Sequence, residues 1–234
     1  PQSVHKHTIY AGDWRYTCVN TDRHSATMKR NGHELATRLW RRMVWLYRWR
    51  HCRGFGIQSP SDYRFVCYVV NEHWPYYAYS DLKPFEESVG TRWHRLGLFF
   101  FRLSNYWHPQ SAVLCGRGMH VFRPYLSMGC RRTSVTVSES ADDISLPSDC
   151  RTCGPVIWIV SASEASGALV ERILGLSVPE WVLVVVGIHR SRGSVRLWKR
   201  LLGDPRVRIT FDLYDAGVVF FDKSRAKQNY TVNF

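Results

Sequence analysis

The segment Pro155–Val186, PVIWIVSASEASGALVERILGLSVPEWVLVVV, has two apolar runs on either side of a helical pattern. Pro155–Val160 and Trp181–Val186 are apolar throughout, which predicts two strands that are buried on both faces of a sheet. Ser163–Leu174 lies between them and has the spacing of a helix. A buried strand, a helix and a second buried strand form the repeating unit of a parallel sheet covered by helices.

The same alternation continues on both sides of this segment. Strands are expected at Ser111–Cys115 and Ser134–Ser138, and helices at Trp93–Trp107 and Ser194–Leu202. The chain ends differently, because three runs expected as strands follow one another without a helix: Val207–Leu213, Gly217–Phe221 and Tyr230–Phe234. We therefore predict an α/β fold, a doubly wound and mostly parallel Rossmann-like sheet that ends in antiparallel strands and is preceded by N-terminal helices.

Two further regions are predicted before the sheet. Residues 1–27 are polar and aperiodic, and we expect an extension that is poorly ordered and ends before Met28. Residues 28–92 form a basic helical region, with helices expected at Leu35–Arg50 and Asp62–Asn71, an aromatic cluster up to Tyr79 and a polar stretch after it. Residues 93–234 form the sheet domain, and a chain of 234 residues is expected to have one main core.

Positive charge is concentrated in the basic helical region. Lysine and arginine number 32 against 19 acids, a formal charge of +13, and Lys29–Arg53 carries eight basic residues against one acid. On Leu35–Arg50 the apolar residues share one arc of the helix, and arginines and two tryptophans lie outside it. The predicted binding surface consists of Arg38, Arg41, Arg42, Trp45, Arg48 and Trp49. It suits an acidic partner, which could be a nucleic acid, an anionic lipid surface or an acidic protein surface; alternatively, the helix docks on its own domain and its charged face is only solvated.

Seven cysteines without a framework spacing favour reduced thiols and a cytoplasmic protein. Cys150 and Cys153 form a single C-x-x-C, which supplies half of a zinc site, so no metal site is predicted. The longest apolar runs are far shorter than the roughly 20 residues that cross a bilayer. No transmembrane segment is therefore expected.

Several short motifs are spread over residues 28–234. They are Gly54–Pro60 (GFGIQSP), Tyr76–Tyr79 (YYAY), Arg95–Leu103 (RLGLFFFRL), Ile188–Ser191 (IHRS), Asp204–Val207 (DPRV), Asp212–Tyr214 (DLY) and Gly217–Phe221 (GVVFF). With these motifs the chain resembles bacterial class I S-adenosylmethionine-dependent methyltransferases, most strongly at its two ends. The resemblance implies a Rossmann-like fold with S-adenosylmethionine across the carboxyl ends of the parallel strands, at the topological switch point.

The resemblance also implies which residues would hold that cofactor. The turn Gly116–Gly118 would approach the methionine moiety, but Leu114 stands at the position of the family's acid and His120 at that of its third glycine. After the second strand, Ser138 stands where the family has an acid for the ribose hydroxyls, and Glu139 follows one residue later. The candidate cofactor-binding residues are Gly116, Gly118, Ser138 and Glu139.

The catalytic positions implied by the resemblance differ as well. Relatives carry carboxylates after the third and fourth strands, where they could bind a divalent metal, whereas this chain has Ile159–Ser163 and Val186–Ser191. His189 is the retained polar residue beside this gap and is the candidate catalytic general base. The interval between Glu139 and Pro155 is too short for the family's additional edge strand, so we predict a domain shortened there.

Three functions follow from these observations, and the sequence leaves open whether the chain is an enzyme. The first is a methyltransferase-like protein with impaired or lost cofactor binding that acts as a binding or scaffolding module. The second is an active enzyme that transfers the methyl group of S-adenosylmethionine to an unidentified acceptor without a metal. The third is a nucleic-acid-binding protein whose affinity, through the basic helix, falls steeply with added salt.

Overall fold

The computed structural model describes residues 39, 42–48, 56–144, 146, 154–162 and 166–234. The chain divides into two compact units, Pro1–Leu46 and Tyr47–Phe234. Residues 39 and 42–48 are helical, and all the elements named below belong to the second unit.

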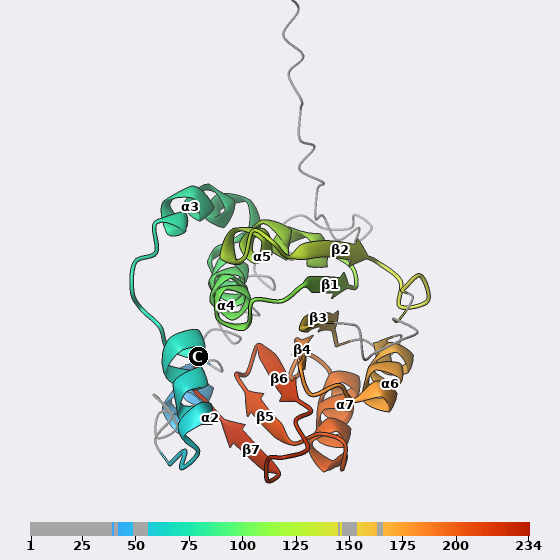
Figure 1. Cartoon of the computed structure of the whole chain (residues 1–234). Coiled ribbons are helices and arrows are strands. Elements are labelled where there is room, and N and C mark those ends of the chain that lie inside the picture. The colour runs from blue at the N-terminus through green and yellow to red at the C-terminus, as the bar shows by residue number, and fades with distance from the viewer. Residues whose placement is uncertain (1–38, 40–41, 49–55, 145, 147–153, 163–165) are drawn as a thin grey trace, which may run out of the picture. The chain divides into compact units, whose positions relative to one another are not determined.

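The second unit is built on a seven-stranded sheet with the strand order β2-β1-β3-β4-β6-β5-β7 (Figure 1). The strands are β1 (Ser111–Cys115), β2 (Ser134–Ser138), β3 (Val156–Ser161), β4 (Trp181–Val186), β5 (Ile209–Asp212), β6 (Ala216–Phe220) and β7 (Gln228–Thr231). The neighbours β2, β1, β3 and β4 pair in parallel. This arrangement confirms the predicted doubly wound, Rossmann-like sheet.

The C-terminal end of the sheet contains antiparallel pairs, as predicted. β6 lies between β4 and β5 and is antiparallel to both. β7 pairs with β5 in parallel. Along the chain, β5, β6 and β7 therefore alternate in direction, as the absence of helices between them suggested, but β7 lies beside β5 and not beside β6. Because β6 ends at the same end of the sheet at which β7 begins, the segment between them only has to pass the end of β5.

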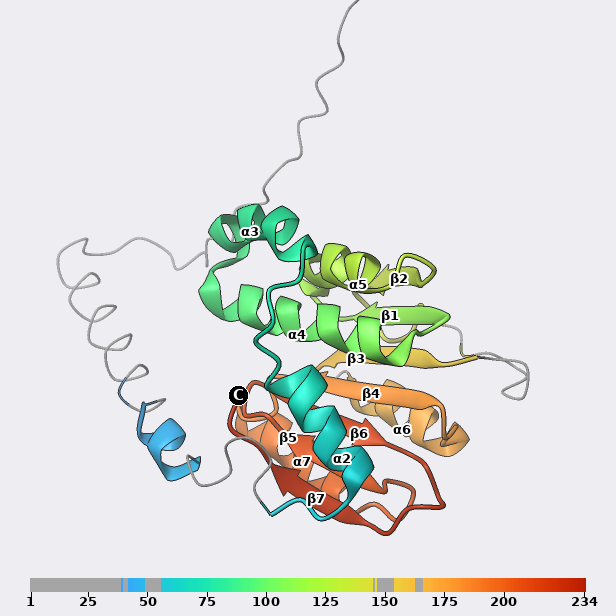
Figure 2. The same cartoon turned by 60° about the vertical axis from the view of Figure 1, so that its left-hand side comes forward.

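Helices cover both faces of this sheet (Figure 2). On one face lie α2 (Pro60–Phe65), the π-helix η2 (Val66–Val70), α3 (Ala78–Val89), α4 (Thr91–Trp107), the short 3-10 helix η3 (Met119–Phe122) and α5 (Arg123–Gly129). On the other face lie α6 (Ser166–Leu176) and α7 (Arg192–Gly203). The connection from β1 to β2 therefore runs over one face and that from β3 to β4 over the other, which places the topological switch point between β1 and β3.

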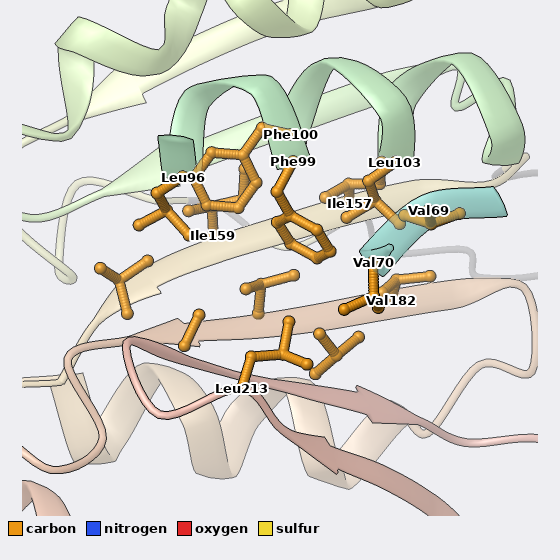
Figure 3. Close-up of a cluster of buried hydrophobic side chains, with 14 of the residues drawn as sticks. Val69, Val70, Leu96, Phe99, Phe100, Leu103, Ile157, Ile159, Val182 and Leu213 are labelled. Atoms are coloured by element: carbon orange, nitrogen blue, oxygen red, sulfur yellow. The ribbon is translucent and has the colours of Figure 1, made fainter. Parts of the chain in front are cut away.

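Two hydrophobic clusters fill the layers and explain why the strands are apolar throughout. Ile157 and Ile159 of β3 point toward α4, where they meet Phe99 and Leu103 (Figure 3). Their neighbour Trp158 points to the opposite face and contacts Trp181, with 5.4 Å between the ring centroids. Because successive side chains of a strand face opposite sides, a sheet covered on both sides needs apolar residues at every position.

Of the helices that precede α4, one was not predicted from the sequence and the others were. α3 occupies the segment expected as a polar stretch; it contains Pro84, and among its residues only Leu82 is fully buried, so it has almost no apolar stripe to detect. α2 and η2 together occupy the helix expected at Asp62–Asn71, and Phe65 belongs to the same cluster as the sheet. The sheet therefore shares its core with helices that precede residue 93.

Candidate functional site

The turn after β1 holds the two glycines predicted to contact a cofactor. Gly116 has φ +117° and Gly118 has φ +77°, conformations that side-chain-bearing residues rarely adopt. The amide of Gly116 donates to the carbonyl of Ser138 at 2.9 Å, so the turn is tied to the end of β2. A Cβ atom at Gly116 would lie 2.7 Å from Cβ of Ser161, at the end of β3. The packing of the two strand ends thus accounts for glycine at position 116 without a ligand.

Side chains of the protein itself fill the space around this turn. Met119 is 2% exposed, and its Cγ lies 3.7 Å from the Cβ position at Gly116. Phe122 is fully buried and packs edge-to-face on Phe100, with ring centroids 4.8 Å apart. His120, at the family's third glycine position, is exposed to solvent. Ser161 and Met119 therefore lie close beside the turn and Phe122 packs in the core below it, while Gly116 and Ser161 both stay partly accessible.

The residues predicted to accept ribose hydroxyls lie next to the turn. Ser138 is the register partner of Cys115, the residue before Gly116, so the structure brings Gly116 and Ser138 together. The Ser138 hydroxyl donates to the carbonyl of Ser140 at 2.8 Å, and Glu139 is exposed. The hydroxyl is thus engaged in the local turn, and the carboxylate is in solvent.

His189 belongs to a cluster that the sequence did not predict. Its Nε2 lies 2.8 Å from Oδ2 of Asp212, and Nη1 of Arg48 lies 2.8 Å from Oδ1 of the same carboxylate. Nη2 of Arg48 is 3.3 Å from His189 Nε2. Tyr214 completes the cluster: its ring stacks on the imidazole at 5.3 Å, and the Arg48 guanidinium lies 5.3 Å from its centroid. Arg48 and Asp212 are 164 residues apart in sequence, so no local pattern connects them.

The electrostatics of this cluster determine what His189 can do. Burial alone would raise the pKa of Asp212, but hydrogen bonds from His189 and Arg48 lower it to about 2. Asp212 is therefore ionised at neutral pH and can only accept hydrogen bonds, so Nε2 of His189 carries a proton when it bonds to this oxygen. A protonated Nε2 cannot accept from Nη2 of Arg48, so the 3.3 Å approach of these two nitrogens is a contact and not a hydrogen bond in this arrangement.

A pocket of about 140 Å³ lies beside the switch point, over the carboxyl ends of β3 and β4. It is lined by Arg92, Trp93, Leu96, Ser161, Val186, Gly187, Arg190 and Asp215. Nη2 of Arg92 lies 2.6 Å from Oδ1 of Asp215. The lining does not include any of the five residues predicted as cofactor-binding or catalytic. Arg92, Trp93 and Asp215 come from the start of α4 and from the β5–β6 turn, and their sequence context carries no signal of a common site.

The predicted binding surface on the basic helix is described in part. Arg42 and Trp45 are exposed, with 51% of Trp45 accessible. The side chain of Arg48 is only 11% exposed, because it lies in the cluster with Asp212. Arg38, Arg41 and Trp49 lie outside the described residues.

The remaining predictions concern metals, thiols and membranes. Within the described ranges, no group of three or more His, Cys, Asp or Glu side chains could hold a metal ion, and Cys150 and Cys153 lie outside those ranges. Cys67, Cys115 and Cys130 are free thiols, and burial raises the pKa of Cys115. Of the helices in the described part of the chain, none is both long and apolar enough to cross a bilayer. The cytoplasmic location stays a prediction.

Comparisons with known proteins give structural matches only. No protein-family model matches the chain, and no curated protein matches it. One similar solved structure is the SAH-bound methyltransferase PaMTH1 from Podospora anserina, with 9% identity and a TM-score of 0.46; the match covers 71% of this chain and 97% of that one. Another is cofactor-bound Rv0187 from MTB, with 14% identity and a TM-score of 0.43, covering 70% of this chain and 99% of that one. The Rossmann-like fold itself is shown by the strand order and the two helical layers.

Proposed function

We propose that this chain is a class I methyltransferase-like protein that has lost binding of S-adenosylmethionine in the usual crevice and works as a binding module. One observation carries the proposal: Cβ of Ser161 and Cγ of Met119 lie only 2.7 Å and 3.7 Å from the position that a Cβ atom would take at Gly116, which leaves little space beside the turn. In doubly wound folds the ligand binds in the crevice at this switch point. The residues present do not fit an adenosyl cofactor there.

The polar groups beside the crevice support the same conclusion. Leu114, at the position of the family's first acid, is fully buried in the core and offers no oxygen to an ammonium group. The Ser138 hydroxyl already donates to Ser140, and Glu139 is in solvent. A ligand with a charged amine and two ribose hydroxyls needs fixed acceptors, because desolvating these groups without partners costs free energy.

The groups beyond β3 and β4 also disfavour the metal-assisted chemistry of the resembling family. Among the described lining residues Asp215 is the one carboxylate, and it is paired with Arg92, while Arg190 adds a second positive charge. Two guanidinium groups repel a divalent cation, and a single paired carboxylate does not compensate for its lost hydration. The proposal therefore assigns no metal to this end of the sheet.

The exposed part of the basic helix supports a role in binding. Arg42 and Trp45 are accessible, and a tryptophan next to arginines suits contacts with an acidic protein surface or with nucleic acid. Arg38, Arg41 and Trp49 lie outside the described residues and are members of the proposed surface on the sequence pattern alone. Arg48 is excluded from it, because its guanidinium is bound to Asp212 within the folded unit.

The loss of cofactor binding is tested by isothermal titration of the full chain with S-adenosylhomocysteine. We expect no saturable heat up to about 1 mM ligand. Such a result would place the dissociation constant above about 1 mM, which corresponds to a binding free energy weaker than about −4 kcal/mol. If the chain is instead an active methyltransferase, it should bind S-adenosylhomocysteine with micromolar affinity, and the variant Glu139→Gln should bind it more weakly. Saturable micromolar binding by the wild type would contradict the proposal, whether or not Glu139 contributes.

The contact surface is tested with single-stranded and duplex oligonucleotides at several salt concentrations. If the partner is a nucleic acid, the logarithm of the association constant should fall linearly with the logarithm of the salt concentration. The affinity should also be lower in the double variant Arg42→Gln, Trp45→Ala. We expect the oligonucleotides to bind weakly and with little dependence on Arg42 and Trp45, because the proposed partner is an acidic protein surface. Tight, salt-dependent binding that requires Arg42 and Trp45 would instead assign the surface to nucleic acid.

A further inference from the structure

The charges of the described side chains that line the pocket over β3 and β4 do not sum to zero. Arg92 and Asp215 form an ion pair, with 2.6 Å between Nη2 and Oδ1. Arg190 lines the same pocket, and its guanidinium has no hydrogen-bond or ion-pair partner among the described residues. The described lining therefore has one positive charge in excess.

The backbone around Arg190 is held in a fixed turn. The amide of Gly187 donates to the carbonyl of Asp215 at 2.7 Å, and the amide of Arg190 donates to the carbonyl of Gly187 at 2.9 Å. Gly187 has φ +83°, a conformation that favours glycine. Cβ and Cδ of Arg190 lie 3.6 Å and 3.7 Å from the Cβ position at Gly187, so the stem of the side chain packs across the turn. The turn thus holds the Arg190 guanidinium beside the pocket. The hydrogen bond of Gly187 joins the same turn to Asp215, which pairs with Arg92.

The lining of the pocket also contains apolar side chains. Leu96 is 4% exposed and Val186 is 6% exposed, and Trp93, which precedes Leu96 on α4, packs on Phe122 with ring centroids 5.3 Å apart. One buried water needs about 10–15 Å³ of such space, so the pocket has room for about ten waters, the size of a small organic molecule. The described lining thus combines cationic and apolar groups.

We propose that this pocket binds a small organic carboxylate with an apolar body. The carboxylate lies at Arg190, next to the Arg92–Asp215 pair, and the apolar body lies against Trp93 and Leu96. Guanidinium groups bind carboxylates with two parallel hydrogen bonds, and a single negative charge matches the single excess positive charge of the lining. The inference does not depend on the loss of S-adenosylmethionine binding, because the pocket lining excludes the glycine turn.

The test uses benzoate and its neutral analogue benzamide as probes, titrated into the full chain by ligand-observed NMR and calorimetry. We expect saturable benzoate binding with a dissociation constant on the order of 1 mM, because the rim is open to solvent and screens the charge. Benzamide should bind at least about tenfold more weakly, since the charge-assisted hydrogen bond is lost. Inorganic phosphate, which lacks an apolar body, should also bind more weakly than benzoate.

Two variants connect the binding to the residue. Arg190→Gln should weaken benzoate binding by about tenfold or more, and an unchanged melting temperature verifies that the exposed substitution leaves the fold intact. Arg196→Gln, an exposed arginine on α7 outside the pocket, is the matched control and should bind benzoate as the wild type does. The inference is overturned by any of three results: no saturation, equal affinity for benzoate and benzamide, or an Arg190→Gln variant that binds like the wild type. Phosphate binding tighter than benzoate would overturn the proposed ligand class.

Discussion

Replacing Asp212 with asparagine should make the protein less stable by an amount that depends on pH. The folded pKa of Asp212 is about 2, against 3.8 for the free side chain, and the side chain is 13% exposed. This depression is equivalent to about 2 kcal/mol of folding free energy at pH 7. The variant Asp212→Asn keeps the shape but removes the charge that Arg48 and His189 share, so it should lose about that amount.

The depressed pKa of Asp212 also determines how this loss of stability changes with pH. Because the folded pKa is depressed, the stabilisation is fully present well above pH 4, where the unfolded carboxyl is ionised, and is lost as the pH falls toward 2. The difference in unfolding free energy between wild type and Asp212→Asn should therefore fall to about half of its neutral value near pH 3.

Urea unfolding monitored by circular dichroism at several pH values measures this difference directly. Asp222→Asn is the control, since the Asp222 carboxylate accepts from the amide and hydroxyl of Ser224 in a surface turn, and its replacement should change stability by less than about 0.5 kcal/mol. A difference for Asp212→Asn that is below this level at pH 7, or that is constant from pH 7 to pH 3, would refute the electrostatic account of the cluster.

Two further substitutions probe the packing that positions the sheet. Gly97→Ala should destabilise the protein by about 1–3 kcal/mol in urea unfolding, although alanine favours helices, because the new Cβ would lie 2.6 Å from the ring of Tyr125. Tyr125 cannot easily move away, since it is buried and bonded to Nδ1 of His94 at 2.8 Å; a variant as stable as the wild type would show that α4 and α5 can separate. Asp62→Asn should cost about 1–3 kcal/mol, because the buried carboxylate pairs with Arg225 and accepts from Tyr230. An unchanged urea midpoint would show that this pair adds nothing to the attachment of α2.

The sequence predicted the central sheet well because burial on two sides leaves an unambiguous pattern. The bounds of β1, β2 and β4 match their predicted ranges, and β3 is displaced by one residue. The place of β7 beside β5 was harder to predict, since it depends on how the chain passes β5 after β6 and not on the residues of the strand itself. α3 escaped detection because one fully buried residue is too few to produce a helical period.

The candidate site was less predictable than the fold. Gly116 and Gly118 could be placed because a strand end and a positive φ are encoded locally. The pairing of Arg48 with Asp212 and that of Arg92 with Asp215 join segments more than 120 residues apart, so neither has a local signature. The close approach of Ser161 and Met119 to the turn at Gly116 likewise depends on packing in three dimensions.

The position of β6 affects how the protein can fold during synthesis. β6 is the partner of β4 and of β5, yet it follows both in the chain. Until Ala216–Phe220 leaves the ribosome, β4 is an open edge of apolar residues, able to associate with other nascent chains. Shielding by a chaperone would matter most in that interval, when most of the polypeptide has emerged but β5 still lacks the strand that joins it to β4.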